Sequence, residues 1–127
     1  MKGLHHIEIY VSDLKRSTEF WGWLLEKLGY QLYQQWDKGK SWKLGDAYIV
    51  FVQTEKKYLS IPYHRRGVGL NHLAFHVNSV KNLNDFRKEL KSKGVYILYK
   101  KKKLDPNTLY FEDPDRIKVE LVVRNSE

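Results

Sequence analysis

The chain has 127 residues, a length that fits one domain and leaves little room for a second independent one. Hydrophobic residues make up 42% of it and aromatic residues 14%, so the chain can bury a core and does not resemble a disordered segment. Cysteine is absent, which excludes disulfides, thiol nucleophiles and cysteine-based metal sites. We find no signal-peptide pattern and no apolar run approaching the roughly 20 residues of a membrane span, so we expect a soluble, cytoplasmic protein with no membrane partner.

The formal net charge is +8, from 23 basic and 15 acidic side chains. Such an excess suggests nucleic-acid binding as a first hypothesis. The basic clusters, among them Lys56-Lys57 and Arg65-Arg66, nevertheless fall in separate loop-like segments and not along one helix or groove. We therefore expect a solvated basic surface, with an anion-binding role for one cluster as the alternative, and no nucleic-acid partner.

The chain contains an internal repeat. Residues 3–11, GLHHIEIYV, align with residues 69–77, GLNHLAFHV, and the same offset aligns Phe20 with Phe86 and Leu24 with Leu90. Repeats of this kind indicate a duplicated structural unit, here of about sixty residues. Within one domain spanning residues 1–127 we predict a first module at 1–55, a linker at 56–67 and a second module at 68–124.

The first copy begins with the alternation typical of a half-buried strand, because Ile7, Ile9 and Val11 lie on one face and polar or aromatic residues on the other. A helix follows, with Ser12-Asp13 offering N-cap oxygens and Gly29 ending it. Three further strands are predicted, at residues 30–36, 40–44 and 47–53.

The second copy repeats this order. Leu73, Phe75 and Val77 oppose His72, Ala74 and His76 on the first strand, and a helix runs from about Val80 to Gly94. Strands are predicted at residues 96–100, 108–112 and 117–123. Each copy is therefore a βαβββ module, and the fold class is α+β, with the helices covering one face of each sheet.

The polar faces of these strands hold the candidate site. His6, Glu8 and Tyr10 lie on the face of the first strand that points away from the helix, and His72 occupies the position equivalent to His6. Glu120 is the lone carboxylate of an apolar last strand and lies on the corresponding face. If the two sheets face each other across a central cavity, His6, His72 and Glu120 come together.

The chain resembles the vicinal oxygen chelate superfamily, which includes glyoxalase I and the fosfomycin- and bleomycin-resistance proteins. The residues that carry the resemblance are LHHI at 4–7, VSDL at 11–14, GLNHLAF at 69–75, and FEDPD at 111–115 followed by Val119-Glu120. It covers essentially the whole chain and implies paired βαβββ modules around a cavity. Within the superfamily, FWGW at 20–23, LGY at 28–30, His64-Arg65 and GVGL at 67–70 resemble an uncharacterised bacterial glyoxalase-like group.

The resemblance implies that His6, His72 and Glu120 hold a divalent metal ion. Glyoxalase I members have a fourth protein ligand at a position where this chain has Val50, which cannot coordinate a metal, so a three-ligand site of the fosfomycin-resistance type is expected. Two imidazoles and one carboxylate suit Zn, Ni, Mn, Co or Fe and leave positions open for substrate. The alternative is that both histidines are structural core residues.

Further site residues are predicted around this set. Glu8 and Glu120 are the candidate catalytic proton carriers, Glu8 also being a candidate replacement ligand or a partner that orients an imidazole. His64-Arg65-Arg66 is a candidate clamp for an anionic group at the cavity rim, with an ordinary surface loop as the alternative. The residues predicted to bind substrate are Tyr10, Trp42, Tyr48, Arg65 and Tyr110.

The favoured function is a metal-dependent, glyoxalase-like enzyme that acts on a small molecule with two adjacent oxygens, by lyase, isomerase or thiol-transfer chemistry. One alternative is a metal-free antibiotic-resistance protein that sequesters a drug, and the next is an Fe(II) ring-cleaving dioxygenase. An open sheet leaves an exposed edge or face, and related modules pair within or between chains, so a homodimer is expected.

Overall fold

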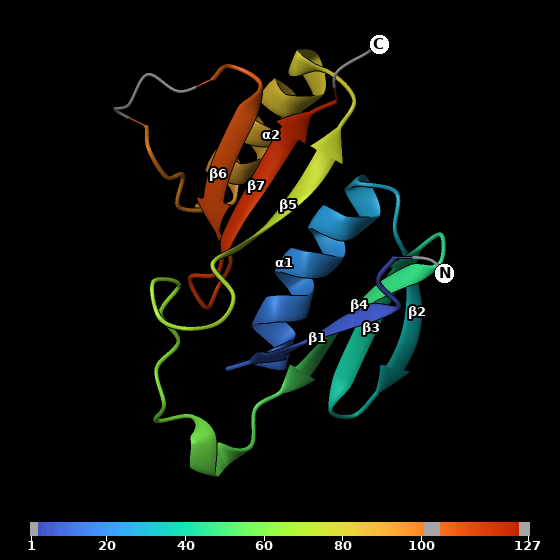
Figure 1. The fold of residues 1–127 in the computed structure, drawn as a ribbon, viewed down its shortest axis with the longest axis vertical. Helices are drawn as coiled ribbons and strands as arrows, with labels where there is room; N and C mark the ends of the chain where they lie inside the picture. The colour runs from blue at the N-terminus through green and yellow to red at the C-terminus, as the bar shows by residue number, and fades with distance from the viewer. Residues whose placement is uncertain (1–2, 101–104, 125–127) are drawn as a thin grey trace. The chain divides into compact units, whose positions relative to one another are not determined.

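The computed structural model describes residues 3–100 and 105–124, which divide into two compact units at Pro62 and Tyr63. Unit 1 runs from blue to green in Figure 1, and unit 2 from yellow-green to red. Each unit is described by itself. None of the helices in the described residues is long and apolar enough to cross a membrane.

Unit 1 contains one helix, α1, and a four-stranded sheet with the strand order β1-β4-β3-β2. Strands β1 and β4 pair in parallel, and the other two pairings are antiparallel. The unit thus forms the predicted βαβββ module, and a short 3-10 helix at Lys56–Tyr58 follows it. Its elements are β1 (His6–Val11), α1 (Leu14–Lys27), β2 (Gln31–Trp36), β3 (Gly39–Leu44) and β4 (Ala47–Gln53).

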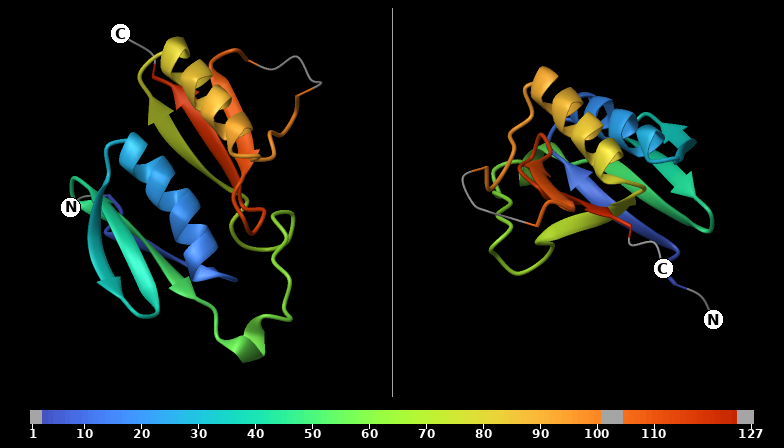
Figure 2. Two further views of the ribbon diagram at one scale, coloured as in Figure 1. Left: turned by 180° about the vertical axis from the view of Figure 1, so that it is seen from behind. Right: turned by 90° about the horizontal axis from the view of Figure 1, so that it is seen from above.

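Helix α1 covers one face of this sheet (Figure 2). The carboxylate of Asp13 accepts a hydrogen bond from the backbone N–H of Arg16 at 3.1 Å, which satisfies a donor that the first turn leaves unpaired. The indole of Trp21 stacks on Phe51 of β4, with ring centroids 5.1 Å apart. Burial of this apolar face leaves the opposite face of the sheet, with His6, Glu8 and Tyr10, on the side away from the helix.

Unit 2 contains helix α2 (Val80–Ser92) and a three-stranded sheet with the order β5-β7-β6. Its first and last strands again pair in parallel. Ser79 caps α2 as Asp13 caps α1, accepting from the backbone N–H of Asn82 at 3.1 Å. The strands are β5 (His72–Val77), β6 (Thr108–Glu112) and β7 (Lys118–Val123). The matching element order and caps confirm the α+β fold of paired modules.

The strand predicted at residues 96–100 is not a full strand. Only an isolated bridge joins Ile97 to Phe111, although the backbone N–H of Leu98 donates to Tyr110 and that of Glu112 donates to Tyr96. Tyr99 has φ of 59°, a left-handed conformation that turns the chain out of the extended path. The described part of unit 2 therefore has one strand fewer than unit 1.

Candidate functional site

His72 and Glu120 lie side by side on unit 2. In the parallel pairing of β5 with β7, Ala74 is opposite Glu120, so His72 and Glu120 project from the same face of the sheet. His72 Nε2 is 3.1 Å from Glu120 Oε1. The side chains are 35% and 15% exposed, so the pair is partly shielded and still open to a ligand.

The other side of the His72 ring is fixed by Asn71. The Asn71 side-chain amide donates through Nδ2 to the carbonyl oxygen of Arg65 at 2.9 Å, which turns its Oδ1 toward His72 Nδ1, 2.7 Å away. Because Oδ1 can only accept, His72 Nδ1 carries the proton of that hydrogen bond. In a neutral imidazole, Nε2 is then a lone-pair acceptor that faces the carboxylate oxygen of Glu120.

Two acceptors 3.1 Å apart need a positive charge between or beside them. A second proton on the imidazole satisfies this requirement, and so does a metal ion, which takes exactly these two donor types from protein side chains. The residues present therefore fit a divalent cation. The orienting partner on Nδ1 is also the arrangement that metal-ligating histidines usually have.

Tyr110 borders the same pair. It lies directly across from Glu120 in the antiparallel pairing of β6 with β7. Burial raises the pKa of Tyr110, and the negative charge of Glu120 and a hydrogen bond to it raise the pKa further. The tyrosine is therefore held as a neutral O–H donor beside the carboxylate.

His6 has an equivalent arrangement in unit 1. Its Nδ1 is 2.8 Å from Nδ1 of His5, and its ring stacks on Tyr48 with centroids 4.7 Å apart and planes 5° from parallel. His5 aligns with Asn71 in the repeat. In both units, the residue before the candidate histidine engages Nδ1 and leaves Nε2 as the ring nitrogen available to a ligand.

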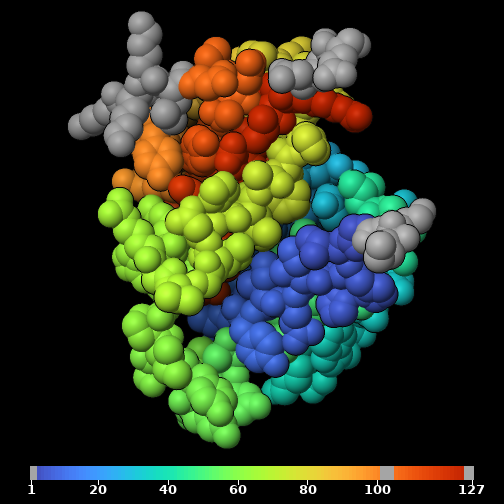
Figure 3. Space-filling model, viewed as in Figure 1, coloured from blue at the N-terminus to red at the C-terminus, as the bar shows by residue number. Residues whose placement is uncertain are grey.

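Glu8 and Tyr10 share the His6 face of β1, and both are exposed. The atoms of the β1 segment are drawn in blue in Figure 3. Glu8 is opposite Val50 in the pairing of β1 with β4, whereas in unit 2 Ala74 is opposite Glu120. Val50 thus occupies the register position equivalent to Glu120. At this pair of opposite positions each unit has one carboxylate, which is Glu8 on β1 in unit 1 and Glu120 on β7 in unit 2.

Trp42 does not line this face, and the prediction that it does is wrong. In the sheet Trp42 pairs with Ile49, which pairs with Ile7, so its side chain lies on the helix side, opposite His6 and Tyr48. Its ring packs against Gly22 of α1, and its Nε1 donates to Glu26 at 3.0 Å. Trp42 is a core residue, 3% exposed.

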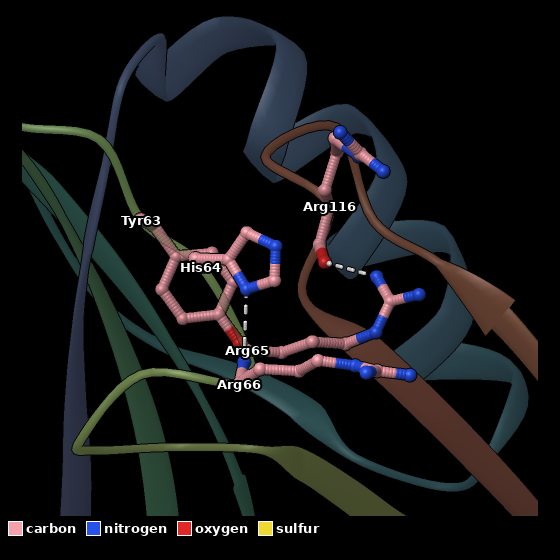
Figure 4. A pocket seen from close by; sticks show the side chains of 5 residues that line it. All are labelled: Tyr63, His64, Arg65, Arg66 and Arg116. Carbon is pink, nitrogen blue, oxygen red and sulfur yellow. Dashed lines mark hydrogen bonds between the residues drawn. The ribbon is translucent and has the colours of Figure 1, made fainter.

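Arg65 lies in a turn before β5 and forms an ion pair with the Glu112 carboxylate, which is also 3.5 Å from Arg116 Nε. It lines a small pocket together with Tyr63, His64, Arg66 and Arg116 (Figure 4). The sequence analysis did not identify Asn71, Glu112 or Arg116. The repeat alignment of Asn71 with His5, next to the two candidate histidines, is a signal that could have identified Asn71.

Within the described residues, no group of three or more His, Asp or Glu side chains is close enough together to hold a metal ion. His72 and Glu120 form a pair in unit 2, and His6 belongs to unit 1. The predicted third ligand therefore remains a prediction, as do the roles of Glu8, Tyr10 and Tyr48.

Comparisons with known proteins agree with this arrangement of elements. A Bacillus subtilis protein, the uncharacterized protein YqjT, is 48% identical over 124 residues, which are 94% of this chain and 97% of its own. The glutathione transferase FosA of Serratia marcescens is 31% identical over 123 residues, covering 97% of this chain and 82% of its own. A crystal structure from Bacillus halodurans, of a protein assigned as a glyoxalase, superposes with a TM-score of 0.91 at 47% identity and covers 95% of both chains.

The family itself follows from a sequence model that spans nearly the whole chain. The model describes the Glyoxalase/Bleomycin resistance protein/Dioxygenase superfamily and matches residues 3–121. This span includes both candidate histidines and Glu120. The chain belongs to the Glyoxalase/Bleomycin resistance protein/Dioxygenase superfamily.

Proposed function

We propose that the protein is a metal-dependent enzyme of the glyoxalase type, in which His6, His72 and Glu120 hold a divalent ion. The observation that carries the proposal is that His72 Nε2 and Glu120 Oε1 face each other 3.1 Å apart, with the opposite side of the ring held by Asn71. When bound, the ion supplies Lewis-acid chemistry toward two adjacent oxygens of a small substrate.

The histidines hold their ligating nitrogens ready through neighbouring side chains. Asn71 orients His72, and His5 and Tyr48 constrain His6 from two sides. Such partners raise the basicity of the ligating nitrogen and reduce the rotamer freedom that binding would otherwise remove. Val50 supplies no ligand in unit 1, which supports a set of three protein ligands with open positions for substrate.

Glu8 is the proton carrier that we assign to the reaction. It is exposed, lies two residues from His6 on the same face of β1, and occupies the position next to Val50. Its carboxylate accepts a proton from the substrate and returns it at a neighbouring atom. Glu120 performs this task only in a state in which it does not bind the metal.

The substrate class is a small polar molecule. Tyr10 and Tyr48 lie on the His6 face, and Tyr110 presents a neutral O–H beside Glu120. The name of the relative FosA, a glutathione transferase, supports thiol transfer as one reaction class. Lyase or isomerase chemistry of the glyoxalase kind is the other.

Metal analysis of protein purified without chelators tests the proposal. We expect about one divalent ion per chain, or saturable binding of added Zn, Ni, Mn, Co or Fe, because three protein ligands of these types form a complete set. His6→Ala, His72→Ala and Glu120→Gln are expected to abolish the binding. His76→Ala removes an exposed histidine from the same strand as His72 and serves as the matched control.

A folded protein that is free of metal and indifferent to added divalent ions would contradict the proposal. Drug binding without any metal dependence would then favour a resistance protein of the sequestering type. With metal-loaded protein, turnover of hemithioacetals would identify the glyoxalase class, and consumption of a thiol with an epoxide antibiotic would identify thiol transfer.

A further inference from the structure

A turn before β5 presents two arginines side by side. The backbone N–H of Gly67 donates to the carbonyl of His64 at 2.9 Å, closing a turn with Arg65 and Arg66 at its centre. The ring of His64 accepts a hydrogen bond from the backbone N–H of Arg66 at 3.1 Å and braces the turn. Figure 4 shows both arginine side chains running in the same direction from this turn.

A third arginine, Arg116 of the loop before β7, also lines the pocket, although its side chain runs away from those of Arg65 and Arg66 in Figure 4. The carbonyl oxygen of Arg116 accepts a hydrogen bond from the Arg65 guanidinium at 3.4 Å (Figure 4). The three arginines line a pocket of about 130 Å³ together with Tyr63 and His64. Since a water molecule occupies about 30 Å³ of liquid, the pocket has room for a group of several heavy atoms.

Two of these cations share one acidic partner. Glu112 is bound by Arg65 and Arg116, and one carboxylate cannot neutralise both. Asp113 accepts at Oδ1 from the backbone N–H groups of Asp115 and Ile117, at 2.8 Å each, and is buried. No acidic side chain is among the residues that line the pocket.

Tyr63 lines one side of the pocket. Its hydroxyl donates to the carbonyl of Leu70 at 2.8 Å, which ties the start of the turn segment to the residue just before Asn71. Asn71 in turn donates to the carbonyl of Arg65. The backbone of the turn that carries Arg65 and Arg66 is therefore held in place before any ligand arrives, which removes part of the entropic cost of binding.

We propose that the pocket formed by Tyr63, His64, Arg65, Arg66 and Arg116 binds a phosphate-class oxyanion, either the free ion or a phosphoryl group on a small molecule. Guanidinium groups pair with phosphate oxygens through parallel N–H donors, and several of them around one dianion give charge-assisted hydrogen bonds. The site belongs to unit 2 alone and needs no metal, so it is independent of the proposed metal-dependent activity.

The test follows the arginine side-chain Nε–H signals by NMR while inorganic phosphate is added to metal-free protein at constant ionic strength. We expect saturable shifts of the Arg65, Arg66 and Arg116 signals, and the same shifts with glycerol phosphate if an ester-bound group is accepted. Chloride and acetate at equal ionic strength are expected to have little effect. Phosphate binding without binding of the ester assigns the site to the free ion.

Arg66→Gln is the informative variant, because no hydrogen bond or ion pair of its guanidinium is found within the described residues and its loss leaves the Arg65–Glu112 pair intact. Loss of one charge-assisted contact weakens binding by about tenfold or more. Arg124→Gln removes an equal charge from the opposite end of β7 and is expected to bind phosphate unchanged.

Shifts that chloride reproduces, or an equal loss of affinity in Arg66→Gln and Arg124→Gln, would overturn the proposal and leave only a diffuse charge effect. Because the titration is done without metal, these outcomes do not bear on the metal ligands. Conversely, phosphate binding that survives His72→Ala would support the pocket even if the metal proposal failed.

Discussion

At the scale of single residues, the main finding is a chain of hydrogen bonds that ends on His72. The carbonyl of Arg65 fixes the amide of Asn71, and this amide fixes the tautomer of His72. The ring nitrogen that faces Glu120 is therefore determined by Asn71, whose side chain bonds to the far side of the ring. Asn71 is a positioning residue.

Replacing Asn71 by Ala is expected to weaken metal binding by about 10- to 100-fold, the usual effect of removing a partner that orients a metal-ligating histidine. Direct titration with Zn or Mn measures this effect without an activity assay. Asn84→Ala, at an exposed position on α2, is the matched control. Equal affinities of Asn71→Ala and the control would show that the ring needs no orienting partner.

Because of Tyr63, the stability of the folded protein is expected to change with pH in the alkaline range. Burial raises the pKa of Tyr63 and nearby Asp113 raises it further, while Arg65 opposes the shift. A tyrosine in the unfolded chain loses its proton at about pH 10. Between that pH and the higher pKa of Tyr63 in the folded protein, the folded state binds more protons than the unfolded state. The contribution of Tyr63 to the free energy of unfolding is therefore complete below about pH 10 and declines above it.

We therefore expect Tyr63→Phe to lose less stability than the parent chain as pH rises above about 10. Denaturant unfolding over a pH series measures the slope. Tyr58→Phe, at an exposed tyrosine of the Lys56–Tyr58 helix, is the control. Parallel pH profiles of Tyr63→Phe and the parent would remove Tyr63 as the source of the decline.

At the scale of elements, α1 lies close against its sheet at Gly22. A Cβ at this position would be 2.9 Å from Cζ2 of the Trp42 ring, closer than real Cβ contacts. Gly22→Ala is therefore expected to destabilise the protein by about 1–3 kcal/mol through overpacking, although alanine favours the helix by up to about 1 kcal/mol. Thermal or denaturant unfolding measures the change.

Trp42→Phe removes the ring atoms that cause the clash, so the cost of Gly22→Ala is expected to fall in that background. A cost that is the same in both backgrounds would place the strain elsewhere. The same contact explains why the position of Trp42 could not be predicted from the sequence. Alternation along β3 does not say which face meets the helix, and the space for an indole comes from a glycine about twenty residues away in the chain.

Most elements could be predicted because both copies of the repeat carry the same periodicity and caps. Asp13 and Ser79 occupy equivalent positions and both cap a helix. The segment at residues 96–100 was not predictable in this way, since its residues favour a strand but Tyr99 adopts a left-handed conformation. The alternation of residues along the strands predicted that His72 and Glu120 lie on the same face of the sheet. The orienting role of Asn71 could not be predicted in this way, because it depends on side-chain hydrogen bonds that periodicity does not encode.

At the scale of the whole molecule, the edge strand β2 is exposed along its entire length. It carries Leu32, Tyr33 and Trp36, which are 51%, 49% and 44% exposed. An edge with unpaired backbone groups and apolar side chains is a natural place for association. This observation supports the prediction that the protein forms a homodimer.

Light scattering coupled to size exclusion is expected to give the mass of two chains. Leu32→Lys places a charge on the edge and is expected to shift the equilibrium toward the single chain, because lysine on an edge strand opposes pairing. Lys38→Leu, in the neighbouring turn, is a control for a general change of charge. A strict monomer at all concentrations would contradict the prediction.

The parallel pairing of the first strand of each unit with the last has a consequence for synthesis of the chain on the ribosome. β1 gains its partner only when β4 has emerged, and β5 only when β7 has. At about 5–20 residues per second, unit 1 has several seconds to fold before β7 appears. Glu120 lies on the last strand of the described chain, so a nascent chain carries both candidate histidines before it carries the carboxylate. The proposed set of metal ligands is then completed only after β7 has been synthesised, so capture of the ion would follow the folding of unit 1.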